Sequence, residues 1–313
     1  MKPSSPSRHS RLDRESSKKI RANGTHYKLD PLVKPEDDRS LRNWLRQAAS
    51  ALQKAGVASA RLDCLVLLEH VLEKNREWVL AHEDYELSVS ELEELNNYLA
   101  QREQRTPLAY TIGSKGFYGY TFSVTPDVLI PRPESEILIE MLQEVVSGHD
   151  VNTIIDVGTG TGCLAITAKL LYPDVHVTAV DNSVAALRIA KKNARRHKVQ
   201  IQFKQMDITN CLPAMPKTRP YIIMANLPYV PDGMVTSTEI TKEPAAALFS
   251  GKDGLDHYRK LWQQIQKLKN KPIYILTESL EPQHTTLREL AMATGYELIQ
   301  TNTLVQLFKK SSL

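Results

Sequence analysis

Apolar segments of strand length alternate with amphipathic segments of helix length from residue 153 to residue 308, and this alternation restricts the fold more than any other feature. Strands are predicted at 153–157, 175–180, 201–205, 221–225, 273–277, 296–300 and 304–308, and helices at 162–171, 184–197, 255–269 and 283–294. Strands joined by helices form an open, largely parallel sheet with helices on both faces. The last two strands have no room for a helix between them, so they must pair antiparallel as a hairpin. The sequence therefore predicts an α/β fold with a seven-stranded sheet.

Residues 37–105 are predicted to form a small helical domain in front of this sheet. Apolar residues recur at helical spacing over 41–52 and form a broad apolar face over 62–72, and Ser90 with Glu93 matches a capping box that opens a third helix. Residues 106–133 are rich in aromatic and β-branched residues and are interrupted by glycines, which predicts a β-hairpin linker. Residues 134–313 then form the α/β domain.

The N-terminal segment, residues 1–36, carries the positive charge of the chain. The whole sequence has a net charge of +4, whereas nine basic and three acidic residues among the first 34 give that segment +6 and leave −2 for the rest. Such an arm either binds nucleic acid or is a disordered, solvated leader, and its serine and proline content favours the leader. The basic count of the chain therefore says little about the substrate.

Composition also restricts the compartment and the chemistry. The longest uncharged run around the apolar centre, residues 157–168, is shorter than the ~20 residues of a membrane-spanning helix, and the start of the chain lacks the apolar stretch of a secretory signal. A cytoplasmic protein is expected. Cys64, Cys163 and Cys211 have neither disulfide nor metal-binding spacing and are expected to be ordinary buried thiols, and no His/Cys cluster predicts a metal site.

A glycine-rich segment, Asp156–Gly162, lies where the first strand of the sheet meets the following helix. Its GxGxG spacing is a weak signal alone, because a tight turn without a ligand would use the same residues. Asp181 strengthens the prediction, since it ends the next strand, where a carboxylate accepts both hydroxyls of a ribose. Together the two features indicate a nucleoside-containing cofactor.

Asp207 and Ile208 follow the third strand and are predicted to flank the adenine ring. Asp207 would lie near the exocyclic amine and Ile208 would pack on the ring. For Asp207 a simple turn cap is an alternative of nearly equal weight.

Asn226-Leu227-Pro228-Tyr229, directly after the fourth strand, has the composition of a receptor for a planar NH₂ group. The side-chain oxygen of Asn226 and a backbone carbonyl stiffened by Pro228 can accept the two hydrogens, while the ring of Tyr229 stacks on the planar amide or base. Such a site acts by positioning the nitrogen rather than through a strong base. The alternative is a β-turn without function.

Four further segments are distinctive, namely Thr106–Tyr110, Gly116–Gly119, Val128–Glu136 and Asp253–Tyr258. Together with the glycine-rich segment and the Asn-Leu-Pro-Tyr motif, they resemble the HemK/PrmC family of peptide chain release factor glutamine methyltransferases. The resemblance covers roughly residues 40–310, and Ile130–Glu134 is its most specific part. It implies a Rossmann-like class I methyltransferase domain that uses S-adenosylmethionine. It also implies methylation of the N5 amide nitrogen of the glutamine in the Gly-Gly-Gln motif of bacterial class I release factors.

The same resemblance implies roles for individual residues. The residues implied in cofactor binding are Gly158, Thr159, Gly160, Thr161, Gly162, Asp181, Asp207, Ile208 and Asn226. Asn226, Leu227, Pro228 and Tyr229 would hold the glutamine and form the catalytic motif. One departure is that Leu227 replaces the first proline of the family's usual Asn-Pro-Pro-Tyr, which keeps the carbonyl and loses some stiffness of the loop. The substrate is expected to be a protein, bound by a monomer without a requirement for nucleic acid or membrane.

Three alternatives stay open. Asn-Leu-Pro-Tyr also resembles ribosomal RNA adenine N6-methyltransferases, which present a flipped base to the same kind of site. Those enzymes carry their helical domain after the catalytic one, whereas this chain has it first. The others are a sister family that methylates a glutamine of a ribosomal protein, and an inactive RNA-binding adaptor with this fold.

Five further residues have weaker signals. Arg132 and Glu134 either line a substrate channel or form a salt bridge that pins the linker, and His257 and Tyr258 are expected to cap or pack a helix. Glu278 ends the fifth strand and lies either near the site or in solvent.

Overall fold

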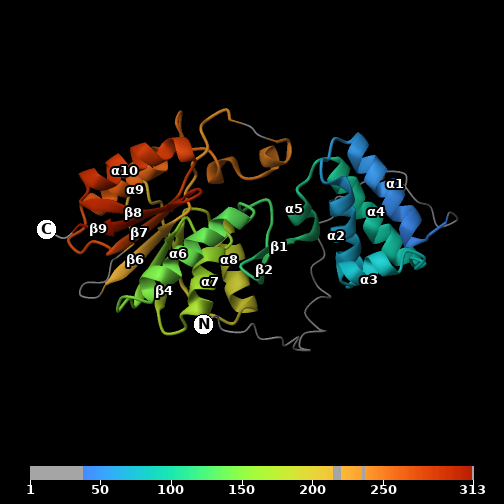
Figure 1. Cartoon of the computed structure of the whole chain (residues 1–313), viewed down its shortest axis with the longest axis horizontal. Coiled ribbons are helices and arrows are strands. Elements are labelled where there is room, and N and C mark those ends of the chain that lie inside the picture. The colour runs from blue at the N-terminus through green and yellow to red at the C-terminus, as the bar shows by residue number, and fades with distance from the viewer. Residues whose placement is uncertain (1–37, 214–219, 235–236, 312–313) are drawn as a thin grey trace.

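The computed structural model describes residues 38–213, 220–234 and 237–311, so the predicted leader, residues 1–36, lies outside the described part of the chain. Figure 1 shows a group of helices on one side and an α/β layer structure on the other, joined by a short helix and a hairpin. The exact domain boundaries given above stay a prediction.

The helical region consists of α1 (Leu41–Lys54), α2 (Ala60–Leu72), α3 (Arg76–Ala81) and α4 (Val89–Glu103). Its helices bury a core of their own, to which α1 contributes the apolar positions predicted from the spacing. The predicted capping box at Ser90 and Glu93 is wrong by two residues, because Ser88 and Glu91 cap α4. Buried Leu87 and Leu92 flank this cap as a hydrophobic staple, which fixes the earlier start.

The predicted hairpin is confirmed only for the middle of the segment 106–133. β1 (Ser114–Phe117) and β2 (Tyr120–Ser123) pair antiparallel, whereas residues 108–112 form the short helix α5 (Leu108–Ile112). Pro107 precedes the first turn of α5, and Gly113 ends it at φ +73°. Aromatic content alone did not distinguish these two conformations.

The predicted seven-stranded sheet is confirmed. Its strands are β3 (Thr153–Val157), β4 (His176–Asp181), β5 (Gln202–Gln205), β6 (Tyr221–Ala225), β7 (Tyr274–Glu278), β8 (Tyr296–Asn302) and β9 (Val305–Lys310). They lie in the order β5-β4-β3-β6-β7-β9-β8, parallel from β5 to β7 and antiparallel where β9 pairs with β7 and β8. This is the predicted Rossmann-like class I methyltransferase arrangement.

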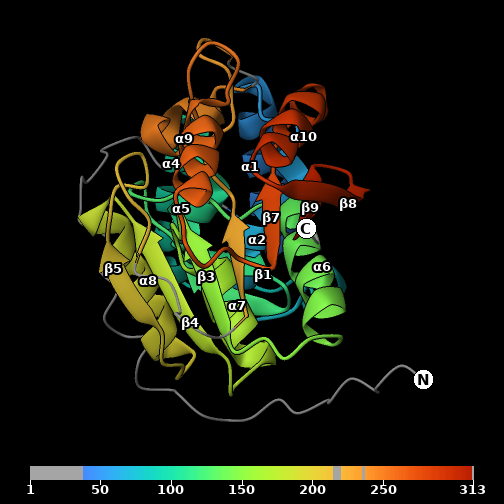
Figure 2. The same cartoon turned by 90° about the vertical axis from the view of Figure 1, so that its left-hand side faces the viewer.

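Helices cover both faces of the sheet. α6 (Glu136–Val146), α7 (Cys163–Leu171) and α8 (Val184–Arg196) pack on one face with Ile154, and α9 (Asp256–Gln266) and α10 (His284–Ala293) pack on the other with Ile155. In Figure 2, α9 and α10 lie together at the top of the view, with α6 and α7 lower down. α6 was not predicted from the sequence, although Leu138, Leu142 and Val145 have helical spacing and are buried.

In the described part of the chain, no helix combines the length and apolar character needed to cross a membrane. Cys64 is buried and Cys163 half-buried, but the prediction of a buried thiol is wrong for Cys211, which lies exposed in the loop after β5.

Candidate functional site

The glycine-rich loop after β3 lies directly against the loop after β6. These two strands are parallel neighbours, so their carboxyl ends share one edge of the sheet. Gly158 has φ +76°, and a Cβ at this position would lie 3.0 Å from Cδ2 of Leu227 and 3.6 Å from the carbonyl oxygen of Asn226. A side chain there would be strained and would push the two loops apart. The two predicted motifs therefore form one site.

A cavity, here called the glycine-loop cavity, opens beside this contact. Gly158, Gly160, Asp181, Asp207, Ile208 and Asn226 are among the residues on its wall. Thr159, Thr161 and Gly162 are instead buried within the loop. Six of the nine predicted cofactor residues thus line one cavity.

Asp181 lies at the end of β4 and fixes the glycine-rich loop. One carboxylate oxygen accepts a hydrogen bond from the backbone N–H of Gly160 (2.9 Å) and the other from that of Ser183 (2.9 Å). Burial raises the pKa of Asp181, and these backbone hydrogen bonds partly offset the effect. Each carboxylate oxygen has a further lone pair, so the group can also accept hydrogen bonds from a ligand.

Asp207 caps a turn after β5 and also borders the glycine-loop cavity. Its carboxylate accepts hydrogen bonds from the backbone and hydroxyl of Thr209 (2.9 and 2.7 Å) and from the side chain of Asn210 (3.0 Å), as a turn cap does. Hydrogen bonding by Thr209 lowers the pKa of Asp207. The residue also borders the cavity beside Ile208, whose apolar side chain is 8% exposed.

Asp156, beneath the glycine-rich loop, is a fully buried carboxyl group. It accepts a hydrogen bond from the hydroxyl of Thr159 (2.6 Å), and its other oxygen has no hydrogen-bond partner among the described atoms. Burial raises the pKa of Asp156 to about 7. The folded protein therefore holds a proton here at pH values where the unfolded chain has lost it.

This difference predicts a pH-dependent stability. Because the folded-state pKa of Asp156 lies above the unfolded value of about 4, the free energy of unfolding falls as the pH rises between these values and levels off above about 7. Asp156→Asn removes the titration. Denaturant unfolding of both proteins at pH 5 and pH 8 should show wild type losing about 2 kcal/mol relative to the variant. If wild type and Asp156→Asn differed in free energy of unfolding by the same amount at pH 5 and pH 8, the raised pKa of Asp156 would be contradicted.

The side chain of Asn226 is oriented by Ser135. Its amide nitrogen donates a hydrogen bond to the Ser135 hydroxyl oxygen (2.9 Å), which turns the amide oxygen away from that partner. Among the described residues, no group donates to this oxygen or to the carbonyl oxygen of Leu227. Two neighbouring acceptors are therefore available for an incoming NH₂ group.

Tyr258 holds the backbone of the motif from below. Its fully buried hydroxyl accepts hydrogen bonds from the N–H groups of Leu227 (3.3 Å) and Glu278 (3.3 Å). The same hydroxyl lies 3.0 Å from the carbonyl oxygen of Ala225 and 2.5 Å from that of Glu278, and donates its hydrogen to this pair. Tyr258 was expected to cap or pack a helix, and in the structure its hydroxyl joins the ends of β6 and β7.

The ring of Tyr229 is held by Glu278. The Tyr229 hydroxyl donates a hydrogen bond to one carboxyl oxygen of Glu278 (2.9 Å), and the carboxyl is completely buried. The second carboxyl oxygen of Glu278 has no partner of good hydrogen-bond geometry among the described atoms. Burial raises the pKa of Glu278, and the nearby side chains of Ser135 and Asn226 offset part of this rise. Glu278 thus lies at the site and not in solvent, and it fixes the aromatic face.

A second cavity, here called the Tyr229 cavity, lies on the other side of the motif. Its wall includes Arg132, Leu227, Tyr229, Ile240, Leu248 and Leu280. Asn226 and Leu227 border both cavities. Arg132 also forms the predicted kind of salt bridge, with the buried carboxylate of Glu243 (2.5 Å), whereas Glu134 is exposed. Asn226 and Leu227 therefore lie between two cavities.

Two family models match this chain. Residues 43–113 match the family model described as the PrmC N-terminal domain, and residues 133–255 match that of the methyltransferase small domain. A methyltransferase structure from Pyrococcus furiosus is 16% identical with a TM-score of 0.46, covering 68% of this chain and all of that one.

Curated relatives carry a more specific description. The release factor glutamine methyltransferase of Coxiella burnetii is 34% identical over 246 residues, covering 76% of this chain and 86% of the relative. That of Bordetella pertussis is 36% identical over 62% of this chain and 72% of its own length. The bifunctional methyltransferase of Rickettsia bellii is 29% identical, and this chain spans about half of it. The chain belongs to the release factor glutamine methyltransferase family.

Proposed function

We propose that this protein transfers the methyl group of S-adenosylmethionine to the N5 amide nitrogen of the glutamine in the Gly-Gly-Gln motif of bacterial class I release factors. The observation that carries the proposal is the pair of open acceptors on Asn226 and Leu227 between two cavities. Family membership supports the same activity.

The residues of the glycine-loop cavity fit the proposed cofactor. Gly158 and Gly160 leave room for an adenosyl group, the Asp181 carboxylate suits ribose hydroxyls, and Ile208 offers an apolar surface to adenine. When bound, S-adenosylmethionine supplies an electrophilic methyl group. Asp207 and Asn226 would complete the cofactor site.

The motif would act on the glutamine by positioning it. The amide oxygen of Asn226 and the carbonyl oxygen of Leu227 accept the two N–H hydrogens, which directs the nitrogen lone pair towards the glycine-loop cavity. Tyr229, fixed by Glu278, packs against the planar amide, and Pro228 stiffens the loop. Held in this way, the nitrogen would accept the methyl group that S-adenosylmethionine supplies, with the sulfur keeping the electron pair of the broken bond, and would then release one of its two protons to water.

The decisive experiment supplies methyl-labelled S-adenosylmethionine with a release factor, with ribosomal RNA and with ribosomal proteins in separate reactions. Label is expected on the release factor and should disappear when the Gly-Gly-Gln glutamine is replaced by alanine. Label on RNA alone or on a ribosomal protein alone would overturn the proposal. The reaction is expected to need no nucleic acid and no membrane, and light scattering is expected to show a monomer.

Asp181→Ala should weaken cofactor binding at least about tenfold, because it removes two hydrogen-bond acceptors for the ribose and releases Gly160. Titration calorimetry with S-adenosylmethionine measures the change. The matched control is Asp207→Ala, whose carboxylate is largely occupied by Thr209 and Asn210 and whose loss should matter less. Equal affinity of Asp181→Ala and wild type would exclude the proposed ribose contact.

A further inference from the structure

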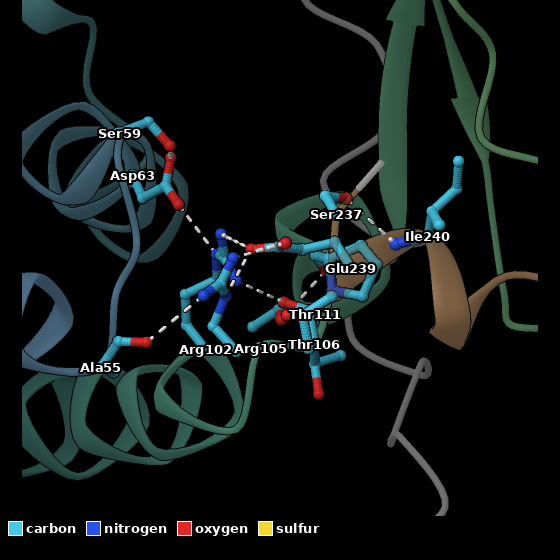
Figure 3. Close-up of polar contacts among 12 residues, drawn as sticks. Ala55, Ser59, Asp63, Arg102, Arg105, Thr106, Thr111, Ser237, Glu239 and Ile240 are labelled. Carbon is cyan, nitrogen blue, oxygen red and sulfur yellow. Dashed lines mark hydrogen bonds and ion pairs between the residues drawn. The ribbon is translucent and has the colours of Figure 1, made fainter. Parts of the chain in front are cut away.

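Four charged residues connect the helical region to the loop that borders the Tyr229 cavity (Figure 3). Glu239 opens the one-turn helix η3 (Glu239–Lys242), and its carboxylate accepts hydrogen bonds from Arg105 through Nε (2.7 Å) and Nη2 (2.7 Å). Arg102 donates to the same carboxylate (3.0 Å) and to Asp63 of α2 (2.8 Å). We call Asp63, Arg102, Arg105 and Glu239 the Glu239 clasp.

The clasp is a largely buried, charge-balanced group. Arg102 and Asp63 are 5% and 4% exposed, and two guanidinium groups face two carboxylates. Arg105 lowers the pKa of Glu239 to about 2 by hydrogen bonding, so the carboxylate stays charged throughout the physiological pH range. Removing one partner from such a group leaves an uncompensated charge, which is costly.

The backbone conformation of Arg105 favours glycine, which indicates that the arginine side chain is needed at this position. Arg105 has φ +62°, a left-handed conformation that glycine adopts more easily and that costs another residue about 1 kcal/mol or more. The long side chain offsets this cost through the two-point contact with Glu239. A helix end that needed only to stop would be better served by glycine.

The clasp is the electrostatic link between two parts of the molecule. Among the ion pairs of the described residues, those that join residues 38–112 to residues beyond 133 all end on Glu239. The core of the helical region is separate from the two cores of the sheet. A small apolar cluster also joins the two parts, because Ala109 of α5 packs with Ala186 and Ile189 of α8. The orientation of the helical region therefore depends on this cluster and on the clasp.

The other side of the same loop reaches the candidate site. Ile240, next to Glu239, lines the Tyr229 cavity, and Ala247 borders both cavities. Glu243 pairs with Arg132 and accepts a hydrogen bond from the backbone N–H of Ile130 (3.1 Å). The loop is thus fixed at Glu239 to the helices and at Glu243 to the segment in front of α6.

We infer that Glu239 is a positioning residue: it sets the placement of the helical region relative to the Tyr229 cavity, so that a protein held by the helices presents its glutamine in register with Asn226 and Leu227. This inference rests on the proposed function, because only a macromolecular substrate contacts both parts. Once the helices can tilt, a release factor contacts the helices and the Asn226-Leu227 pair at the same time only after the tilt has been reversed. The cost therefore falls on binding of the factor and raises its KM, whereas the reaction of a fully bound factor is little changed.

The first test is a double-mutant cycle with Glu239→Gln, Arg105→Gln and the double variant, assayed with an intact release factor. Each variant should raise KM for the factor about tenfold, and the double variant should be no worse than either single one. The turnover number at saturating factor and the affinity for S-adenosylmethionine should stay within about threefold of wild type. Arg76→Gln, which breaks an ion pair inside the helical region, is the matched control and should leave KM unchanged. A fall in turnover with unchanged KM, or no change in either, overturns the inference.

A second measurement does not depend on the substrate. Spin labels at Ser50→Cys on α1 and Met292→Cys on α10, with exposed Cys211 replaced by serine, report the distance between the two parts. Glu239→Gln should broaden the distance distribution, and an unchanged distribution overturns the inference. If wild type failed to methylate a release factor while the distribution still broadened, the proposed function would fall and the clasp's positioning of the helices would stand.

Discussion

Asn226→Ala is expected to lower the turnover number at least about 100-fold while S-adenosylmethionine still binds with similar affinity. The variant loses one of the two acceptors that hold the substrate NH₂ group, whereas the glycine-rich loop and Asp181 stay in place. Single-turnover rates measure the first effect and titration calorimetry the second.

Ser135→Ala is the graded comparison for this prediction. It leaves the Asn226 amide intact and removes only the hydrogen bond that orients it, so its loss of turnover should be smaller. A rate for Asn226→Ala near that of wild type would refute the amide-receptor mechanism. If affinity for S-adenosylmethionine fell as much as turnover, Asn226 would act only in cofactor binding and not as an acceptor for the substrate amide.

Gly254→Ala should abolish most activity and destabilise the protein by about 3 kcal/mol. Gly254 has φ +78°, and a Cβ there would lie 2.1 Å from the carbonyl oxygen of Tyr229 and 2.4 Å from the side-chain nitrogen of Gln283. Gln283 donates a hydrogen bond to that same carbonyl (2.7 Å), so the added methyl group would displace the end of the motif together with its support. Thermal unfolding and methylation rates check the two effects.

Gly148→Ala is the control, because a Cβ at Gly148 meets no atom within 4 Å. It should behave like wild type within about 0.5 kcal/mol. An active, stable Gly254→Ala protein would show that the loop after Asn226 tolerates displacement, which would count against a positioned mechanism.

The fold could be predicted largely because periodicity and strand length are local properties. The alternation from residue 153 onwards specified the parallel sheet and its terminal hairpin, both of which are confirmed. The short helices α3 and α5 were not predicted. They span only six and five residues, too few for a clear periodic pattern, and their conformation depends on packing by distant parts of the chain. α6 begins at the last residue of the Val128–Glu136 motif, and the helical spacing of its apolar residues is the signal from which it could have been predicted.

The candidate site could be predicted only where its residues follow strands. Strand ends place Gly158, Asp181 and Asn226 at one edge of the sheet, and the structure brings them together. Their roles stay predictions. The supporting contacts could not be predicted, because Ser135 lies 91 residues from Asn226, and Glu278 lies 49 residues from Tyr229. Side-chain direction over such separations is decided by tertiary packing.

The Glu239 clasp has a consequence for protein engineering. Arg102 and Arg105 lie more than a hundred residues from Glu239, yet each is matched to it in charge and geometry. A chimera that takes its helical region from one relative and its sheet from another would combine unmatched halves of a largely buried ion-pair group. Exchange of substrate specificity between relatives should therefore succeed only when the loop around residues 237–243 is transferred together with the helices.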